Sequence, residues 1–289
     1  MGHIFRREDA EQYEAWFRSP AGRVAEALLW DLLLRLWKPA SRQEVLDVGC
    51  GPGLLFQWLV QQGHCVTGID PSPEMLDMVR WRVPHGTAPD RGFAENLPYD
   101  DNAFDTVFLV NTLEFVEDPL AALHEAFRVS RRQVIVAAWN RYSLAALQNA
   151  VEGLWRSSPF KHARLFSVLQ LRHLAEEAMG GPIPAQWHTG LIFPRPLTSV
   201  LSFLERWPVL QEQPLGHLIA MRLSPPTLWR TLQDPLLCKW PQGIEATPFH
   251  SSCYRTGVAS QPSRPARRTG LTLPSPPPVS QEPFSDVTG

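Results

Sequence analysis

Short apolar runs alternate with longer stretches of helical spacing over residues 1–223. Apolar runs of about six residues are typical of buried parallel strands. Their alternation with helices predicts an α/β fold, a Rossmann-like, doubly wound, mostly parallel sheet with helices on both faces. Strands are expected at residues 44–49, 65–70, 106–111, 134–139, 187–193 and 217–223, and helices at 23–38, 54–62, 73–82 and 119–129.

The pattern also predicts the domain organisation. One domain is expected over residues 1–224, with an N-terminal helical cap at 1–38 and a helical insert at 140–186. Residues 225–259 form an extension of uncertain role. Residues 260–289 are rich in proline and lack apolar periodicity, which predicts a disordered tail. A P-x-x-P spacing in this tail leaves open a protein partner that docks there.

Residues 47–53 read DVGCGPG and lie between a predicted strand and a predicted helix. Glycine at 49, 51 and 53 lets the backbone turn sharply and lets a ligand approach the helix N-terminus. Asp70 ends the next strand, where a carboxylate can accept both hydroxyls of a ribose. These features favour a nucleoside-containing ligand over a plain tight turn. A dinucleotide fingerprint requires a third small residue at position 54, and Leu54 disfavours a nicotinamide cofactor.

Three segments in the right order resemble class I S-adenosylmethionine-dependent methyltransferases. They are EVLDVGCGPG (44–53), AENLPYDDNAFDTV (94–107) and LEFVEDPLAALHEAFRV (113–129), and the resemblance covers roughly residues 40–140. YEAWF (13–17) also resembles a helix that many bacterial members fold over the cofactor. The family implies a seven-stranded sheet whose last strand, near residues 217–223, is antiparallel.

The resemblance further implies S-adenosyl-L-methionine as methyl donor, no metal, and a set of cofactor-binding residues. The methionine half of the cofactor would be surrounded by the loop residues Asp47, Gly49, Cys50, Gly51 and Gly53. The ribose would be held at the end of the second strand by Asp70 and Pro71. The adenine would lie beside Ala94 and Glu95, and the sulfonium beside Asn111.

The chain departs from the family pattern at three places. Phe93 replaces a common Asp beside the adenine, and a core position is favoured for this ring over stacking on the adenine. Phe115 replaces a common His, and SRRQ (130–133) replaces a glycine-containing turn, which predicts a tighter or altered turn. These departures motivate an alternative, a catalytically inactive cofactor-binding or scaffold protein that acts through partners.

Methyl transfer requires mainly that the nucleophile be oriented against the methyl group, so no catalytic residue is assigned. A structural or solvated role is favoured for each candidate base: Tyr13, Glu114, His124, His162 and His188. Acceptor choice is expected in residues 1–38 and in the insert. The apolar side chains of the insert are expected to pack onto the sheet rather than form a lid: Tyr142, Leu147, Trp155, Phe160, Phe166 and Leu169.

Charge and composition limit the classes of acceptor that are expected. The chain has 27 Lys+Arg and 29 Asp+Glu, a net charge of −2, which disfavours nucleic acid. The four cysteines lack a Cys-x-x-Cys spacing, so no zinc site is expected. The most apolar stretch, residues 24–37, contains three charged residues and is too short to span a membrane. With no signal peptide visible, the sequence predicts a cytoplasmic methyltransferase that acts on a small molecule.

Overall fold

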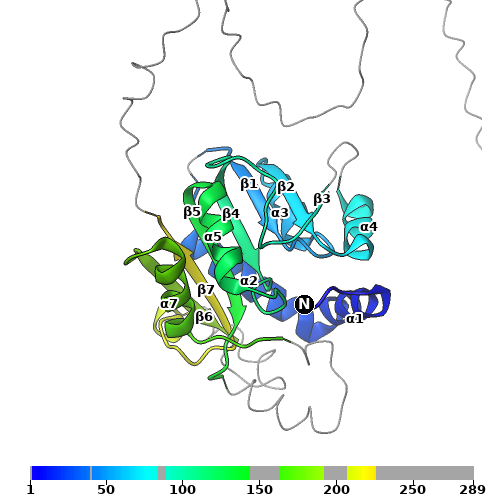
Figure 1. Cartoon of the computed structure of the whole chain (residues 1–289). Helices are drawn as coiled ribbons and strands as arrows, with labels where there is room; N and C mark the ends of the chain where they lie inside the picture. The colour runs from blue at the N-terminus through cyan, green and yellow to red at the C-terminus, as the bar shows by residue number, and fades with distance from the viewer. Residues whose placement is uncertain (1, 40, 84–88, 144–162, 192–206, 226–289) are drawn as a thin grey trace, which may run out of the picture. The chain divides into compact units, whose positions relative to one another are not determined.

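A seven-stranded sheet forms the centre of the protein in a computed structural model that describes residues 2–39, 41–83, 89–143, 163–191 and 207–225 (Figure 1). The strand order is β3-β2-β1-β4-β5-β7-β6. The strands are β1 (Glu44–Val48), β2 (Cys65–Asp70), β3 (Asp90–Arg91), β4 (Phe104–Val110), β5 (Ser130–Trp139), β6 (Ala185–Gly190) and β7 (Leu218–Leu223).

The first five strands are parallel, and β7 runs antiparallel between β5 and β6. This arrangement confirms the doubly wound sheet and its antiparallel last strand. The strand order reverses at β1, which pairs with β2 on one side and β4 on the other. Connections leave β1 and β4 in opposite directions at such a point, so a crevice opens at their carboxyl ends.

Helices cover both faces of the sheet. Side chains alternate along each strand, so Val45 and Phe108 pack with α2 and α3, whereas Leu46 and Leu109 pack with α5 and α7. The helices are α1 (Arg7–Arg18), α2 (Pro20–Leu36), α3 (Leu54–Gln61), α4 (Pro73–Arg82), α5 (Pro119–Val129), α7 (Val168–Met179) and α9 (Pro208–Gln211).

Capping residues decide where three of these helices begin. Ser19, Ser72 and Asp118 each accept a hydrogen bond from a backbone N–H of the first turn, and each is followed by a proline. Helix α2 therefore begins at Pro20, three residues before the predicted start. Strand β3 was not predicted, because its two residues are too few to show a periodicity.

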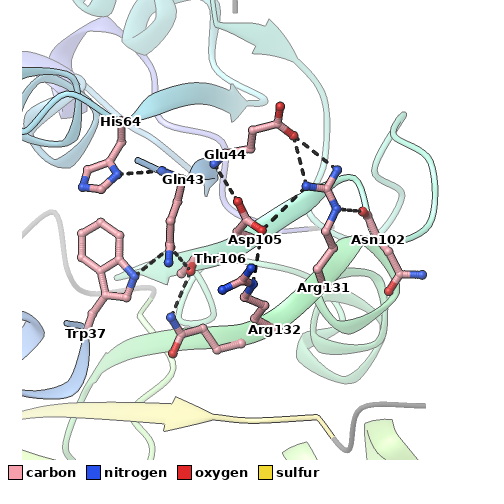
Figure 2. Close-up of polar contacts among 10 residues, drawn as sticks. Trp37, Gln43, Glu44, His64, Asn102, Asp105, Thr106, Arg131 and Arg132 are labelled. Carbon is pink, nitrogen blue, oxygen red and sulfur yellow. Dashed lines mark hydrogen bonds and ion pairs between the residues drawn. The ribbon is translucent and has the colours of Figure 1, made fainter. Parts of the chain in front are cut away.

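A buried polar network closes the amino-terminal edge of the sheet, opposite the crevice (Figure 2). The Gln43 side-chain oxygen accepts hydrogen bonds from Trp37 Nε1 at 3.2 Å and from Thr106 Oγ1 at 2.8 Å. Gln133 Nε2 donates to the same Thr106 hydroxyl at 3.1 Å. This network joins α2, β4 and β5 at one end of the core.

Residues 130–133 form the start of β5, directly after α5, and no separate turn precedes the strand. The altered turn that the SRRQ segment predicts is therefore strand. Arg131 pairs with Glu44 at 3.3 Å, and Arg132 pairs with Asp105 at 3.4 Å (Figure 2). The two arginines thus tie the start of β5 to β1 and β4.

The predicted insert is helical in part. Helix α7 lies within it, and β6 begins at Ala185, inside its predicted boundary. Phe166 is buried, as the packing role requires, whereas Tyr142 and Leu169 are 65% and 78% exposed. Leu147, Trp155 and Phe160 lie outside the described residues, as do the tail and all but the first residue of the extension. Among the described helices, none is long and apolar enough to cross a membrane.

Candidate functional site

A cavity of about 600 Å³ opens at the carboxyl ends of β1, β2 and β4. Its walls come from the glycine loop, from α1 and α2, and from residues 2–5, which we call the N-terminal strap. The structure brings nine of the ten sequence-predicted cofactor residues to this central cavity: Asp47, Gly49, Cys50, Gly51, Asp70, Pro71, Ala94, Glu95 and Asn111.

The glycine loop has left-handed backbone at positions 49, 51 and 53, with φ of +69°, +52° and +83°. A Cβ at Gly49 would lie 2.6 Å from the Thr112 methyl carbon, so this glycine also permits close packing of the loop on the segment that follows β4. The side of Gly51 is open. Gly53 faces Val79 of α4 and does not line the cavity.

Asp70 is buried at the end of β2 and holds the loop in place. Its two carboxylate oxygens accept hydrogen bonds from the backbone N–H groups of Gly51 and Ser72, each at 2.9 Å. Burial raises the pKa of Asp70 to about 6, against the lowering effect of these two hydrogen bonds. The Asp70 side chain is therefore ionised at neutral pH and remains an acceptor.

Asp47 and Asn111 place two further acceptor oxygens in the wall. Both Asp47 Oδ2 and Asn111 Oδ1 are buried and have no hydrogen-bond partner among the residues that the structure describes. Burial, followed by the charge of Asp70, raises the pKa of Asp47 to about 8. Asn111 has left-handed backbone with φ +53°, and its amide also lowers the pKa of the Tyr13 hydroxyl, which burial raises. Buried acceptors without donors indicate a ligand that donates hydrogen bonds.

The wall near Ala94 and Glu95 is held by α5. Glu95 Oε1 accepts the backbone N–H of Glu117 at 2.9 Å, just before α5 begins. Phe93 lines the cavity with 51% of its surface exposed, so the expected core position was wrong. Phe93 forms an isolated antiparallel β-bridge with Asn96, and the turn between them leaves the Phe93 ring outside the core.

The N-terminal strap covers the cavity, and no pattern in the sequence predicts its contacts. The His3 backbone N–H donates to the Phe115 carbonyl at 2.8 Å, and Ser72 Oγ donates to the Phe5 carbonyl at 2.7 Å. The rings of Phe5 and Phe115 meet edge to face with centroids 4.9 Å apart. Phe115, one of the departures from the family pattern, is thus an anchor for the strap.

The candidate bases have different positions. Tyr13 lines the central cavity, Glu114 is buried beside it, His124 is exposed on α5, and His188 is half-buried on β6. His162 lies outside the described residues. Within the described part of the chain, no group of three or more His, Cys, Asp or Glu residues is arranged to hold a metal ion.

Comparison with known proteins identifies this arrangement. The sequence profile of a methyltransferase domain matches residues 46–138. An uncharacterized methyltransferase of Mycobacterium tuberculosis is 42% identical over 117 residues, 40% of this chain and 45% of that protein. The ubiquinone biosynthesis O-methyltransferase of Xylella fastidiosa is 35% identical over 121 residues, 40% of this chain and 49% of that protein. The chain thus spans about half the length of these relatives.

A solved structure extends the likeness beyond the shared core. It is an S-adenosylmethionine-dependent methyltransferase from Thermotoga maritima, described as a possible histamine N-methyltransferase. It is 27% identical with a TM-score of 0.63, and the match covers 76% of this chain and 98% of that chain. The sheet order, the glycine loop and these similarities together support a class I S-adenosylmethionine-dependent methyltransferase.

Proposed function

We propose that this protein transfers a methyl group from S-adenosyl-L-methionine to a small-molecule acceptor inside the central cavity. The observation that carries the proposal is the cavity itself, which lies at the switch point of the sheet and brings together nine residues that the family pattern assigns to the cofactor. The bound cofactor supplies a methyl group activated by a positively charged sulfur.

The residues of the wall fit this cofactor. The open side of Gly51 and the absence of a Cβ at Gly49 leave space for the methionine half. The unpartnered oxygens of Asp47 and Asn111 are suited to accept hydrogen bonds from its ammonium group. Asp70 keeps acceptor capacity for the ribose hydroxyls, because each of its oxygens has more than one lone pair.

The chain's own contribution to the reaction would be enclosure and orientation. The strap, α1 and α2 line the cavity and would limit the access of water, while the loop held by Asp70 would set the position of the methyl donor. Orientation of this kind supplies about 7–11 kcal/mol when the reacting atoms are well aligned. A small acceptor fits beneath such a cover, and the net charge of −2 disfavours nucleic acid.

The family departures do not close the site, which weakens the alternative of an inactive scaffold. Phe93 borders the cavity without filling it, and Phe115 anchors the strap. The ubiquinone biosynthesis O-methyltransferase and the possible histamine N-methyltransferase bear names that refer to small acceptors, and this agrees with the proposal.

Ligand-dependent unfolding of the full chain tests the proposal. S-adenosylhomocysteine at a hundred times its dissociation constant should stabilise the protein by about 2.7 kcal/mol, whereas NAD should not. Asp70→Asn should lose this stabilisation, because one acceptor oxygen becomes a donor that faces a backbone N–H. Asp77→Asn, at an exposed position on α4, is the matched control and should retain it. Stabilisation by NAD alone, or an unchanged response of Asp70→Asn, would contradict the proposal.

A further inference from the structure

The central cavity is lined by carboxylates and aromatic rings, and among its described residues there is no lysine or arginine. Its carboxylates are Glu26, Asp47, Asp70, Glu95, Glu117 and Asp118. The cofactor brings only one net positive charge, and even with Asp47 protonated at its raised pKa of about 8 the other acidic residues of the wall outnumber that charge. This surplus indicates that the acceptor also carries positive charge.

Glu114 offers a specific binding position for the positive charge of the acceptor. Its side chain is 2% exposed, and its Oε1 accepts the backbone N–H of Trp139 at 2.8 Å. Its other oxygen, Oε2, is buried and has no hydrogen-bond partner within the described part of the chain. The Glu114 carboxylate is close enough to the Tyr13 hydroxyl to raise the pKa of that group, and Tyr13 faces the central cavity. A buried carboxylate oxygen in this position is suited to a hydrogen-bond donor that a ligand brings.

Glu114 also lines a second, outer cavity of about 1110 Å³, which shares the strap and residues 115–117 with the central one. The outer cavity contains five carboxylates and two arginines, Arg6 and Arg164. Phe5 and Phe115 line both cavities, and a cation can approach their rings favourably. Acidic residues and aromatic rings thus continue from the outer cavity to the methyl-transfer site.

We propose that the acceptor is a small organic amine, protonated in solution, whose nitrogen binds the free oxygen of Glu114. This inference rests on the proposed function, since it names the acceptor of the same site. A phenolate or a carboxylate would meet the acidic side chains of the central cavity, whose described lining includes no lysine or arginine.

The chemistry of an amine acceptor also requires a group in this position. An ammonium has no lone pair, so its nitrogen must first lose one proton, which Glu114 accepts as a carboxylate. The nitrogen lone pair then forms the C–N bond while the C–S bond breaks, and the sulfur keeps that electron pair. The positive charge passes from sulfur to the methylated nitrogen. Burial raises the pKa of Glu114 to about 8, which makes it a stronger base than an exposed carboxylate.

The test measures binding to the full chain saturated with S-adenosylhomocysteine, so that no turnover occurs. The probes are butylamine, benzylamine and 2-phenylethylamine, each with its matched alcohol and carboxylate. At least one amine should bind at least about thirtyfold more tightly than its alcohol and carboxylate, the lower limit for a buried charge pair. Titrations at pH 7 in buffers of different ionisation heat should show release of about one proton, because Glu114 becomes ionised.

Glu114→Gln should reduce amine affinity at least about thirtyfold and abolish the proton release, while its binding of S-adenosylhomocysteine stays unchanged. The Gln oxygen still accepts the Trp139 N–H, so the fold is retained. Glu8→Gln, at an exposed carboxylate of the outer cavity, is the control and should change neither readout. If S-adenosylhomocysteine does not bind, the proposed function fails. If it binds but no amine exceeds its alcohol, or Glu114→Gln binds amines normally, only the amine inference fails.

Discussion

Replacement of Gly49 by alanine tests the packing of the glycine loop on Thr112, which follows β4. The backbone there has φ +69°, and a new Cβ would lie 2.6 Å from Thr112 Cγ2 and 2.7 Å from Thr112 Oγ1. Left-handed backbone costs an alanine about 1–2 kcal/mol. Overpacking adds about 1–3 kcal/mol, because carbon atoms prefer separations near 3.5–4 Å. Gly49→Ala should therefore lower the free energy of unfolding by about 2–5 kcal/mol.

Two other glycines allow the conformational cost of an alanine to be measured apart from the packing cost. Gly63 and Gly180 have φ of +85° and +70°, and a Cβ at either would meet nothing within 4 Å. Their alanine variants should therefore cost only the conformational term, about 1–2 kcal/mol. Urea unfolding followed by fluorescence gives all three values, provided that the m-values agree. In a Thr112→Ala background the nearest Thr112 contact becomes the 3.1 Å approach to Cβ, so the excess cost should shrink. Equal losses at positions 49, 63 and 180 would refute the packing argument.

Three other perturbations have equally specific outcomes. Gln43→Leu should cost about 1–3 kcal/mol in urea unfolding, because it leaves Trp37 Nε1 without its acceptor, and should leave S-adenosylhomocysteine affinity unchanged. Arg128→Lys should lower both stability and that affinity, because Arg128 binds Glu125 and two carbonyls of the loop that carries residues 94 and 95; calorimetry measures both. Glu114 has a folded pKa of about 8 against an ordinary 4.5, so the folded state binds more protons between these values. Stability of the free protein should therefore fall as pH rises through this window, by at most about 1.4 kcal/mol per pH unit from this group, and Glu114→Gln should remove that contribution in pH-dependent melts.

The sequence predicts well those features of the fold that have a local pattern of apolar residues or glycines. Six of the seven strands, and the loop between β1 and α3, follow from the apolar runs and from glycine at 49, 51 and 53. The start of α2 was misplaced, because the periodicity of apolar residues begins after the capping Ser19. Strand β3 depends on pairing with β2 and has no pattern of its own.

The candidate site, like the fold, could be predicted from the sequence only in part. The ten cofactor residues were proposed from motifs, and nine of them line one cavity. Phe93 was misplaced because an aromatic ring beside Ala94 has the same sequence signature whether it packs inward or borders a cavity. The strap and the free oxygen of Glu114 depend on contacts between segments far apart in the chain, such as His3 with Phe115 and Glu114 with Trp139. Such contacts have no local sequence pattern.

The polar network around Gln43 and the cavity around Gly49 occupy opposite ends of the same strands. Strand β1 has five residues, so its two ends lie roughly 13 Å apart. Substitutions at such separations, without shared partners, usually have additive effects on stability. The network at the amino-terminal edge therefore contributes stability that substitutions around the cavity do not remove. Evolution, or an engineer, can vary the acceptor cavity toward new substrates while the network at the other end keeps the domain folded.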